Sequence, residues 1–136
     1  MKRTFIFTVL AMIILAACSP ASASDIHGVW QLVSYGDPAS PTPAAPDVDT
    51  SIEFKSDGTL GGNVGCNGFG GDYTVRGSTI EFEQMISTLM FCEGSVGEQE
   101  SAILTVFAES ASFTLDSETL TITSADGESV VVLARK

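Results

Sequence analysis

The chain has 136 residues, enough for one domain of ordinary size, and its 17 acidic and six basic residues give a net charge of −11. This acidity argues against a nucleic-acid-binding protein, because such proteins need lysine and arginine to neutralise phosphates. It also argues against electrostatic attachment to anionic lipid, so any membrane attachment has to be covalent.

Residues 1–17 have the features of a lipoprotein signal peptide. A basic start precedes an uncharged, mostly apolar run from Phe5 to Ala17, which is too short to span a bilayer comfortably. The run ends Leu15-Ala16-Ala17-Cys18, which resembles a bacterial lipobox, where the cysteine thiol receives diacylglycerol. We therefore expect export and a lipid anchor on Cys18. The alternative is ordinary secretory cleavage after Ala23, because Ala21-Ser22-Ala23 also has the small-x-small pattern.

The remainder divides into a short tether and one domain. Removal of residues 1–17 leaves four basic residues against 17 acidic ones, a net charge of −13. Residues 18–26 are mostly small and polar and predict a flexible tether, and residues 27–136 form the domain. The residue after Cys18 is Ser19 and not the aspartate that is associated with retention in the inner membrane. It therefore permits passage to the outer membrane if the host has one. The expected location is the cell envelope, membrane-anchored.

Short alternating segments separated by turn residues predict an antiparallel sheet or barrel. In the first segment Trp30 and Leu32 share one face, with Trp30 in the core. Residues 36–47 hold four prolines and predict a loop. The predicted strands cover residues 28–35, 51–55, 59–60, 73–76, 79–83, 112–115, 119–123 and 129–134.

Residues 61–72 contain six of the 13 glycines and organise the chain. Glycine loses backbone entropy on folding and packs no side chain, so an ordinary strand or helix is not expected here. Bulges, turns and close backbone approach are expected instead. Whether this stretch is a recognition surface or a structural corner stays open. Asn67, Phe69 and Tyr73 are candidates for outward-facing contacts, and the alternative for Phe69 and Tyr73 is a place in the core.

One helix is predicted after Cys92. Ser95 and Glu98 have the spacing of a capping box. Apolar residues then follow at helical spacing and form one stripe, at Ala102, Ile103, Val106 and Phe107.

These motifs together resemble the META domain family over residues 27–136. The carrying residues form four groups: Gly28, Trp30 and Leu32; Gly65, Cys66 and Asn67 with the aromatics Phe69 and Tyr73; Thr88, Met90 and Cys92; and Glu100, Leu104, Phe107, Leu120 and Ile122. Phe91 and Phe113 depart mildly from the family pattern, where alanine and tyrosine are usual, and both keep apolar character.

The resemblance implies a mainly β, α+β fold: a buckled antiparallel sheet or pseudo-barrel of about seven or eight strands with one packed helix. It implies no established enzymatic activity and no cofactor. Members are exported or lipid-anchored and are associated with envelope stress, antibiotic tolerance or, in parasites, virulence. The expected function is a non-catalytic contact or binding role in the envelope, for a monomer whose envelope partner is unknown.

The chain has two cysteines besides Cys18, namely Cys66 and Cys92. Because the chain is expected to be exported, this pair favours a structural disulfide. A redox-active disulfide, free thiols, or a nucleophilic Cys66 paired with His27 are the alternatives. Structural zinc wants four cysteine or histidine ligands, so no metal site is predicted. The rival functions are a barrel that binds a small apolar ligand and a thiol enzyme that uses Cys66.

Overall fold

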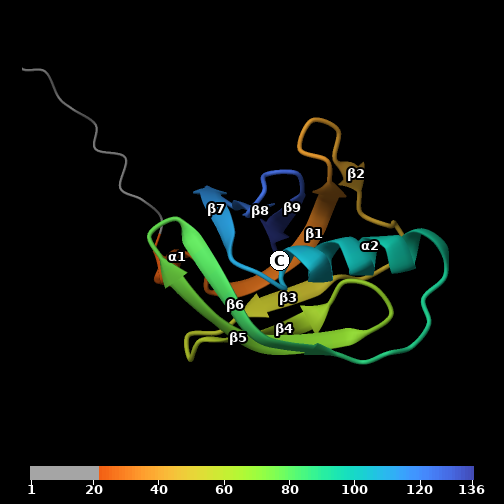
Figure 1. Cartoon of the computed structure of the whole chain (residues 1–136), viewed down its shortest axis with the longest axis horizontal. Coiled ribbons are helices and arrows are strands. Elements are labelled where there is room, and N and C mark those ends of the chain that lie inside the picture. The colour runs from red at the N-terminus through yellow and green to blue at the C-terminus, as the bar shows by residue number, and fades with distance from the viewer. Residues whose placement is uncertain (1–21) are drawn as a thin grey trace, which may run out of the picture.

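Alternating apolar residues build nine strands in the computed structural model, which describes residues 22–136 (Figure 1). The predicted signal peptide and the lipidation site Cys18 lie outside the described residues. The strands are β1 (Gly28–Gly36), β2 (Thr42–Pro43), β3 (Ser51–Phe54), β4 (Thr59–Asn63), β5 (Gly68–Arg76), β6 (Thr79–Ser87), β7 (Ala111–Asp116), β8 (Thr119–Ser124) and β9 (Val130–Arg135).

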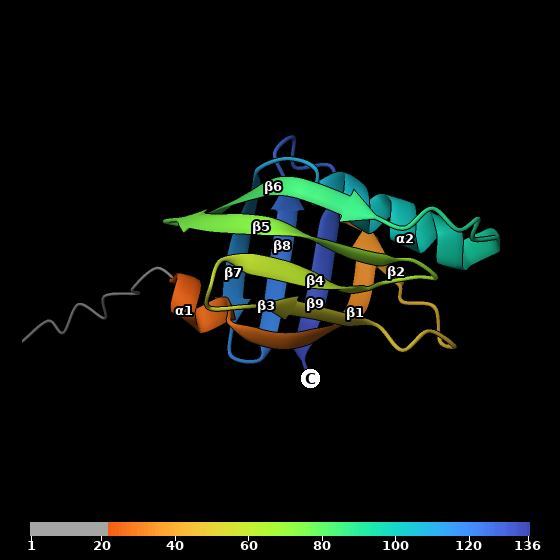
Figure 2. The ribbon, with the colours of Figure 1, turned by 90° about the horizontal axis from the view of Figure 1, so that it is seen from below.

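Eight strands close an antiparallel barrel in the order β1-β3-β4-β5-β6-β7-β8-β9, and β9 pairs again with β1. The strand β2 adds to β1 outside this ring. Figure 2 shows two layers, with β3 to β6 crossing over β7 to β9. Strand β1 joins both layers, because its first residues pair with β3 and its remainder pairs with β9. The predicted fold class, mainly β with one packed helix, is confirmed.

Side chains from both layers fill the barrel interior and form one apolar cluster. Trp30 is fully buried, as predicted, and its indole Nε1 donates a hydrogen bond to the carbonyl of Ile26 at 2.8 Å. The predicted inward residues Leu32, Ile52 and Phe54 are also buried. The alternation of apolar and polar residues therefore correctly predicts which face of these strands lies in the barrel interior.

The expectation that the glycine-rich stretch avoids regular strands was wrong. Five of its six glycines lie in β4 and β5, which pair with each other. A Cβ on Gly62 would overlap the Ser51 carbonyl oxygen, and a Cβ on Gly71 would overlap Met85 and the Glu83 carbonyl. Glycine is needed at these positions because the neighbouring strands approach closely. Gly71 lies at a bulge between β5 and β6, and a bulge was expected in this stretch. The stretch forms most of the β4–β5 hairpin.

The helix α2 (Gly94–Val106) begins one residue before the predicted capping box. Its N-cap is Glu93, and no side-chain cap bond forms. The first turn of the helix lies directly against Cys92, because a Cβ on Gly97 would overlap the Cys92 carbonyl oxygen. The predicted stripe is correct: Ile103, Val106 and Phe107 are buried and Ala102 packs at its edge.

Part of the predicted tether is structured. Residues Ala23–Ile26 form the one-turn helix α1, and Ile26 is fully buried. The domain therefore begins before residue 27, because Ile26 supplies both an apolar side chain and the carbonyl that the Trp30 indole needs. Within residues 22–136 neither helix has the length and apolar composition needed to cross a bilayer.

Candidate contact site around Asn67

Asn67 lies in the turn between β4 and β5 and is buried, with 4% of its surface exposed. Its backbone N–H donates to Oε2 of Glu100 at 2.8 Å, and its side-chain Nδ2 donates to Oε1 at 2.6 Å. Glu100 lies in α2 and is itself 8% exposed. A buried carboxylate is costly unless donors surround it, so this pair fastens the helix to the turn.

Asn67 also holds the chain that follows β6. Its Oδ1 accepts hydrogen bonds from the Thr88 hydroxyl and from the Met90 backbone N–H, both at 2.8 Å. Its Nδ2 donates to the Met90 carbonyl at 3.0 Å. The Thr-x-Met part of the sequence motif therefore contributes the Thr88 hydroxyl and the backbone N–H and carbonyl of Met90. The Met90 side chain does not take part in these bonds.

The predicted pair Cys66 and Cys92 forms a disulfide, with Cα atoms 6.1 Å apart and 26 residues apart in sequence. The bond ties the turn that carries Asn67 to Cys92, which precedes the N-cap residue Glu93 of α2. Gly65, the first residue of the Gly-Cys-Asn motif, has no space for a side chain because a Cβ would lie 2.8 Å from the Glu100 Cβ. The motif residues predicted from three separate segments thus meet at one place.

Gln99, the neighbour of Glu100, extends this arrangement and was not singled out by the sequence. Its Nε2 donates to the Val64 carbonyl at 2.6 Å, and its Oε1 accepts from the Ala45 N–H at 2.7 Å. Gln99 is fully buried, so both bonds replace contacts with water. The helix is therefore bonded to the turn and to the proline-rich loop.

An exposed apolar segment lies beside this network. We define it as residues 86–91, in which Ile86 is 74% exposed, Leu89 95%, Met90 61% and Phe91 87%. Of these apolar residues, only Met90 and Phe91 were singled out from the sequence, as part of the family resemblance and not as exposed side chains. A signal was present, because Leu89-Met90-Phe91 is a run without alternation, and consecutive strand side chains cannot all face one core.

The candidates for outward-facing contacts lie in the interior instead. Asn67, Phe69 and Tyr73 are all buried. Tyr73 packs edge-to-face on Phe54 with ring centroids 5.1 Å apart, and its hydroxyl donates to the Lys55 carbonyl at 2.8 Å. Burial, and then the charge of Asp57, raise the pKa of Tyr73. The core interpretation of the two aromatics is correct.

The sulfur atoms of Cys66 and Cys92 and a carboxylate oxygen of Glu100 lie within 4.8 Å of one another. A thiolate is the form of cysteine that attacks substrates and binds metals, and in the disulfide neither sulfur is a thiolate. The Glu100 carboxylate is already engaged by Asn67. His27 ends α1, and its carbonyl accepts a hydrogen bond from Arg135 at 2.9 Å. The disulfide and the Glu100 carboxylate therefore stabilise the fold.

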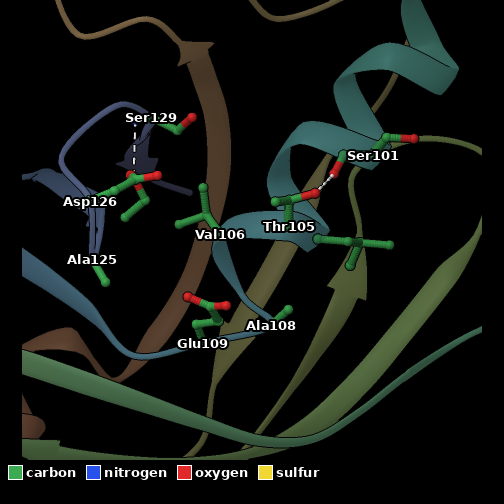
Figure 3. Close-up of a pocket in the computed structure, with 10 residues that line it drawn as sticks. Ser101, Thr105, Val106, Ala108, Glu109, Ala125, Asp126 and Ser129 are labelled. Atoms are coloured by element: carbon green, nitrogen blue, oxygen red, sulfur yellow. Dashed lines mark hydrogen bonds between the residues drawn. The ribbon is translucent and has the colours of Figure 1, made fainter.

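A hollow of about 890 Å³ lies between the C-terminal half of α2 and the β8–β9 turn (Figure 3). Its lining includes two carboxylates, Glu109 and Asp126, together with hydroxyl groups. Asp126 already accepts bonds from the Ser124 hydroxyl at 2.6 Å and from the Glu128 N–H at 2.9 Å, so it serves the turn. Both bonds lower the pKa of Asp126, and the bond from Ser124 has the larger effect.

Comparison with known proteins identifies the domain. The family model described as the META domain matches residues 24–136. No curated protein matches the chain.

Solved structures share the fold at low sequence identity. An NMR structure of a protein from Burkholderia xenovorans is 15% identical with a TM-score of 0.68, covering 96% of this chain and 99% of that one. A second NMR structure is 19% identical with a TM-score of 0.66, covering 84% and 94%. The crystal structure of a DUF4847 family protein from Bacteroides vulgatus ATCC 8482 is 17% identical with a TM-score of 0.59, covering 82% and 94%.

Proposed function

Because this chain belongs to the META domain family, we propose that it is a non-catalytic contact module of the cell envelope, held at a membrane by a lipid on Cys18. The observation that carries the proposal is the exposed apolar segment, residues 86–91. Large apolar side chains placed together in water mark an interaction site more often than a solvated surface. Each such side chain contributes about 1.5 to 3 kcal/mol when a partner buries it.

The segment is held in place before any partner binds. Asn67 bonds to Thr88 and to both the backbone N–H and the carbonyl of Met90, and the disulfide at Cys92 holds the chain just after the segment. A segment that is already ordered loses less conformational entropy on binding, so more of the burial energy appears as affinity. This rigidity supports recognition by contact.

The position of the segment suits a protein anchored at its N-terminus. Figures 1 and 2 place α1 and the first turn of α2 at opposite ends of the long axis. A lipid on Cys18 would join the domain at α1, so the apolar segment would face away from the attachment point. The setting we propose, from the family resemblance, is envelope stress or antibiotic exposure.

Two other functions have less support. A barrel that binds an apolar ligand needs interior space, and the interior here is filled by the protein's own side chains. The hollow in Figure 3 is lined by carboxylates and hydroxyl groups together with apolar side chains such as Leu104 and Val106, and it lies between α2 and the β8–β9 turn, outside the barrel interior. A thiol enzyme needs a free Cys66, and that sulfur is bonded to Cys92.

Site-specific photocrosslinking in the cells that make the protein tests the proposal. A photoreactive residue replaces Leu89 or Phe91, and a matched control replaces Thr114, which is exposed on β7 outside the apolar segment. We expect adducts with an exported protein at the first two positions and none at the control. Absence of adducts above the control at both positions would overturn the contact function. A mature N-terminus at Ser24 without lipid would overturn the anchor.

A further inference from the structure

The charge of the chain is distributed unevenly, and the apolar segment lies in its most acidic part. Between Gly77 and Ala134 the sequence has ten acidic residues and no lysine, arginine or histidine. Three basic residues outside this region are committed to ion pairs: Arg76 with Glu81, Arg135 with Glu118, and Lys136 with Asp49. No cation of the apolar segment or of α2 offsets the local negative charge.

A hollow of about 530 Å³ separates the apolar segment from the start of α2. Met90 and Phe91 form one wall, and Gly94, Gly97 and Glu98 form the other. The glycines add no side chains, so the hollow stays open to solvent between an apolar wall and a carboxylate. Glu93, the exposed N-cap residue, lies between the lining residues Cys92 and Gly94 in the sequence.

A further hollow, of about 400 Å³, borders the first half of the same segment. Ile86, Ser87 and Thr88 face Gly68, Phe69 and Gly70 across it. The exposed Ile86 side chain therefore borders a shallow groove with little charge. A partner that covers Leu89 would lie next to an uncharged groove at residues 86–88 and an acidic hollow at Met90 and Phe91.

We infer that the partner of the apolar segment is a basic amphipathic polypeptide segment, with leucine-like side chains beside lysine or arginine. This inference rests on the proposed contact function and specifies its partner. The apolar side chains bury Leu89 and Phe91, while the cations pair with Glu93 and Glu98. Opposite charge beside an apolar centre is the arrangement that gives an interface its specificity.

Other occupants fit the charges less well. Anionic lipid headgroups and a second copy of this chain are both negative, so the carboxylates beside the segment would repel them. The N-terminus of α2 carries about half a positive charge, which is less than the two full charges of Glu93 and Glu98. The net local field favours a cation.

The test uses the full-length protein in nanodiscs of neutral phosphatidylcholine, with fluorescence anisotropy as the readout. The probe is a labelled peptide of leucine and lysine at helical spacing, and its control replaces every lysine by glutamate. We expect the lysine peptide to bind at least about tenfold more tightly than the glutamate peptide. The variant Glu93→Lys/Glu98→Lys should lose about tenfold in affinity, and Leu89→Ser/Phe91→Ser should abolish binding.

The matched control is Glu109→Lys/Glu128→Lys, which changes the net charge equally at exposed positions away from the apolar segment. It should weaken the lysine peptide by less than about threefold. Equal binding of both peptides, equal loss in both charge-reversal variants, equal signal on empty nanodiscs, or dimers of this chain crosslinked through position 89 would each overturn the inference. Adducts at Leu89 in cells would still support contact, so the two failures are distinguishable.

Discussion

Asn67 donates two hydrogen bonds to the carboxylate of Glu100, one from its backbone N–H at 2.8 Å and one from Nδ2 at 2.6 Å. The two residues are 33 positions apart, and both are buried. The same asparagine accepts bonds from Thr88 and Met90. One side chain therefore joins the β4–β5 turn, the apolar segment and α2, and buried networks of this kind specify a single arrangement when every member is satisfied.

The first prediction concerns Asn67. Asn67→Ala should lower the free energy of unfolding by about 3 kcal/mol, because Glu100 loses its side-chain donor and the backbone N–H and carbonyl of Met90 each lose a partner. Urea denaturation of wild type and variant measures this difference. Asn63→Ala is the control, since it removes one part-buried bond to the Gly65 N–H and should cost about 1 kcal/mol. Equal losses in the two variants would contradict the central position of Asn67.

The second prediction concerns the disulfide. Its loss in Cys66→Ala/Cys92→Ala should lower the free energy of unfolding by about 3 kcal/mol, because a loop of 26 residues is released in the unfolded chain. The Asn67 bonds to Thr88 and Met90 do not depend on sulfur, so the domain should still fold. Thermal melts with and without reductant measure the effect, and thiol labelling of the unreduced wild type is the control. Two reactive thiols in that sample would refute the bond.

The third prediction compares two glycines in neighbouring strands. Gly62→Ala should destabilise by about 2 to 3 kcal/mol, because its Cβ would overlap the Ser51 carbonyl and force β3 and β4 apart. Gly70→Ala places its Cβ 3.5 Å from the Leu60 carbonyl oxygen, an ordinary contact, and should change stability by less than about 1 kcal/mol. Both changes affect the unfolded chain equally, so a difference between the two midpoints in urea reports the native packing. Similar midpoints would mean that β4 does not need glycine at Gly62.

The fourth prediction concerns pH. The Thr59 hydroxyl, at 2.7 Å, and then the Thr59 N–H, at 3.0 Å, bond to Asp57 and lower its pKa. A carboxyl whose pKa is lower in the folded state adds stability above its unfolded pKa of about 3.9 and loses it as the pH falls through the folded value. Wild type should therefore be more stable than Asp57→Asn at pH 7, and this advantage should shrink below about pH 4. Urea midpoints across this range measure it; a constant difference would contradict the cause given.

The sequence predicted the strands well where one face is buried and the other is solvated. Ile52 and Phe54 illustrate this, because their alternation with polar neighbours follows directly from the geometry of a strand. The same reasoning failed for Gly62 and Gly71. Their place in paired strands depends on which neighbour approaches them, and local sequence carries no record of that neighbour.

The candidate site shows the same division. The motif residues could be named from the sequence, yet their roles could not. Met90 is held by its backbone while its side chain is exposed, and Glu100 is buried although glutamate is usually solvated. Which part of a residue is used depends on contacts between segments more than 20 positions apart.

The sequence by itself determined the mainly β fold, the stripe of α2 and the pairing of Cys66 with Cys92, because periodicity and a lone cysteine pair are local or compositional signals. Only the tertiary structure decided that Asn67 is buried and that Leu89 and Phe91 are exposed. The physical reason is that burial depends on packing between distant segments: the barrel and α2 enclose Asn67 and leave the residues before Cys92 outside the core.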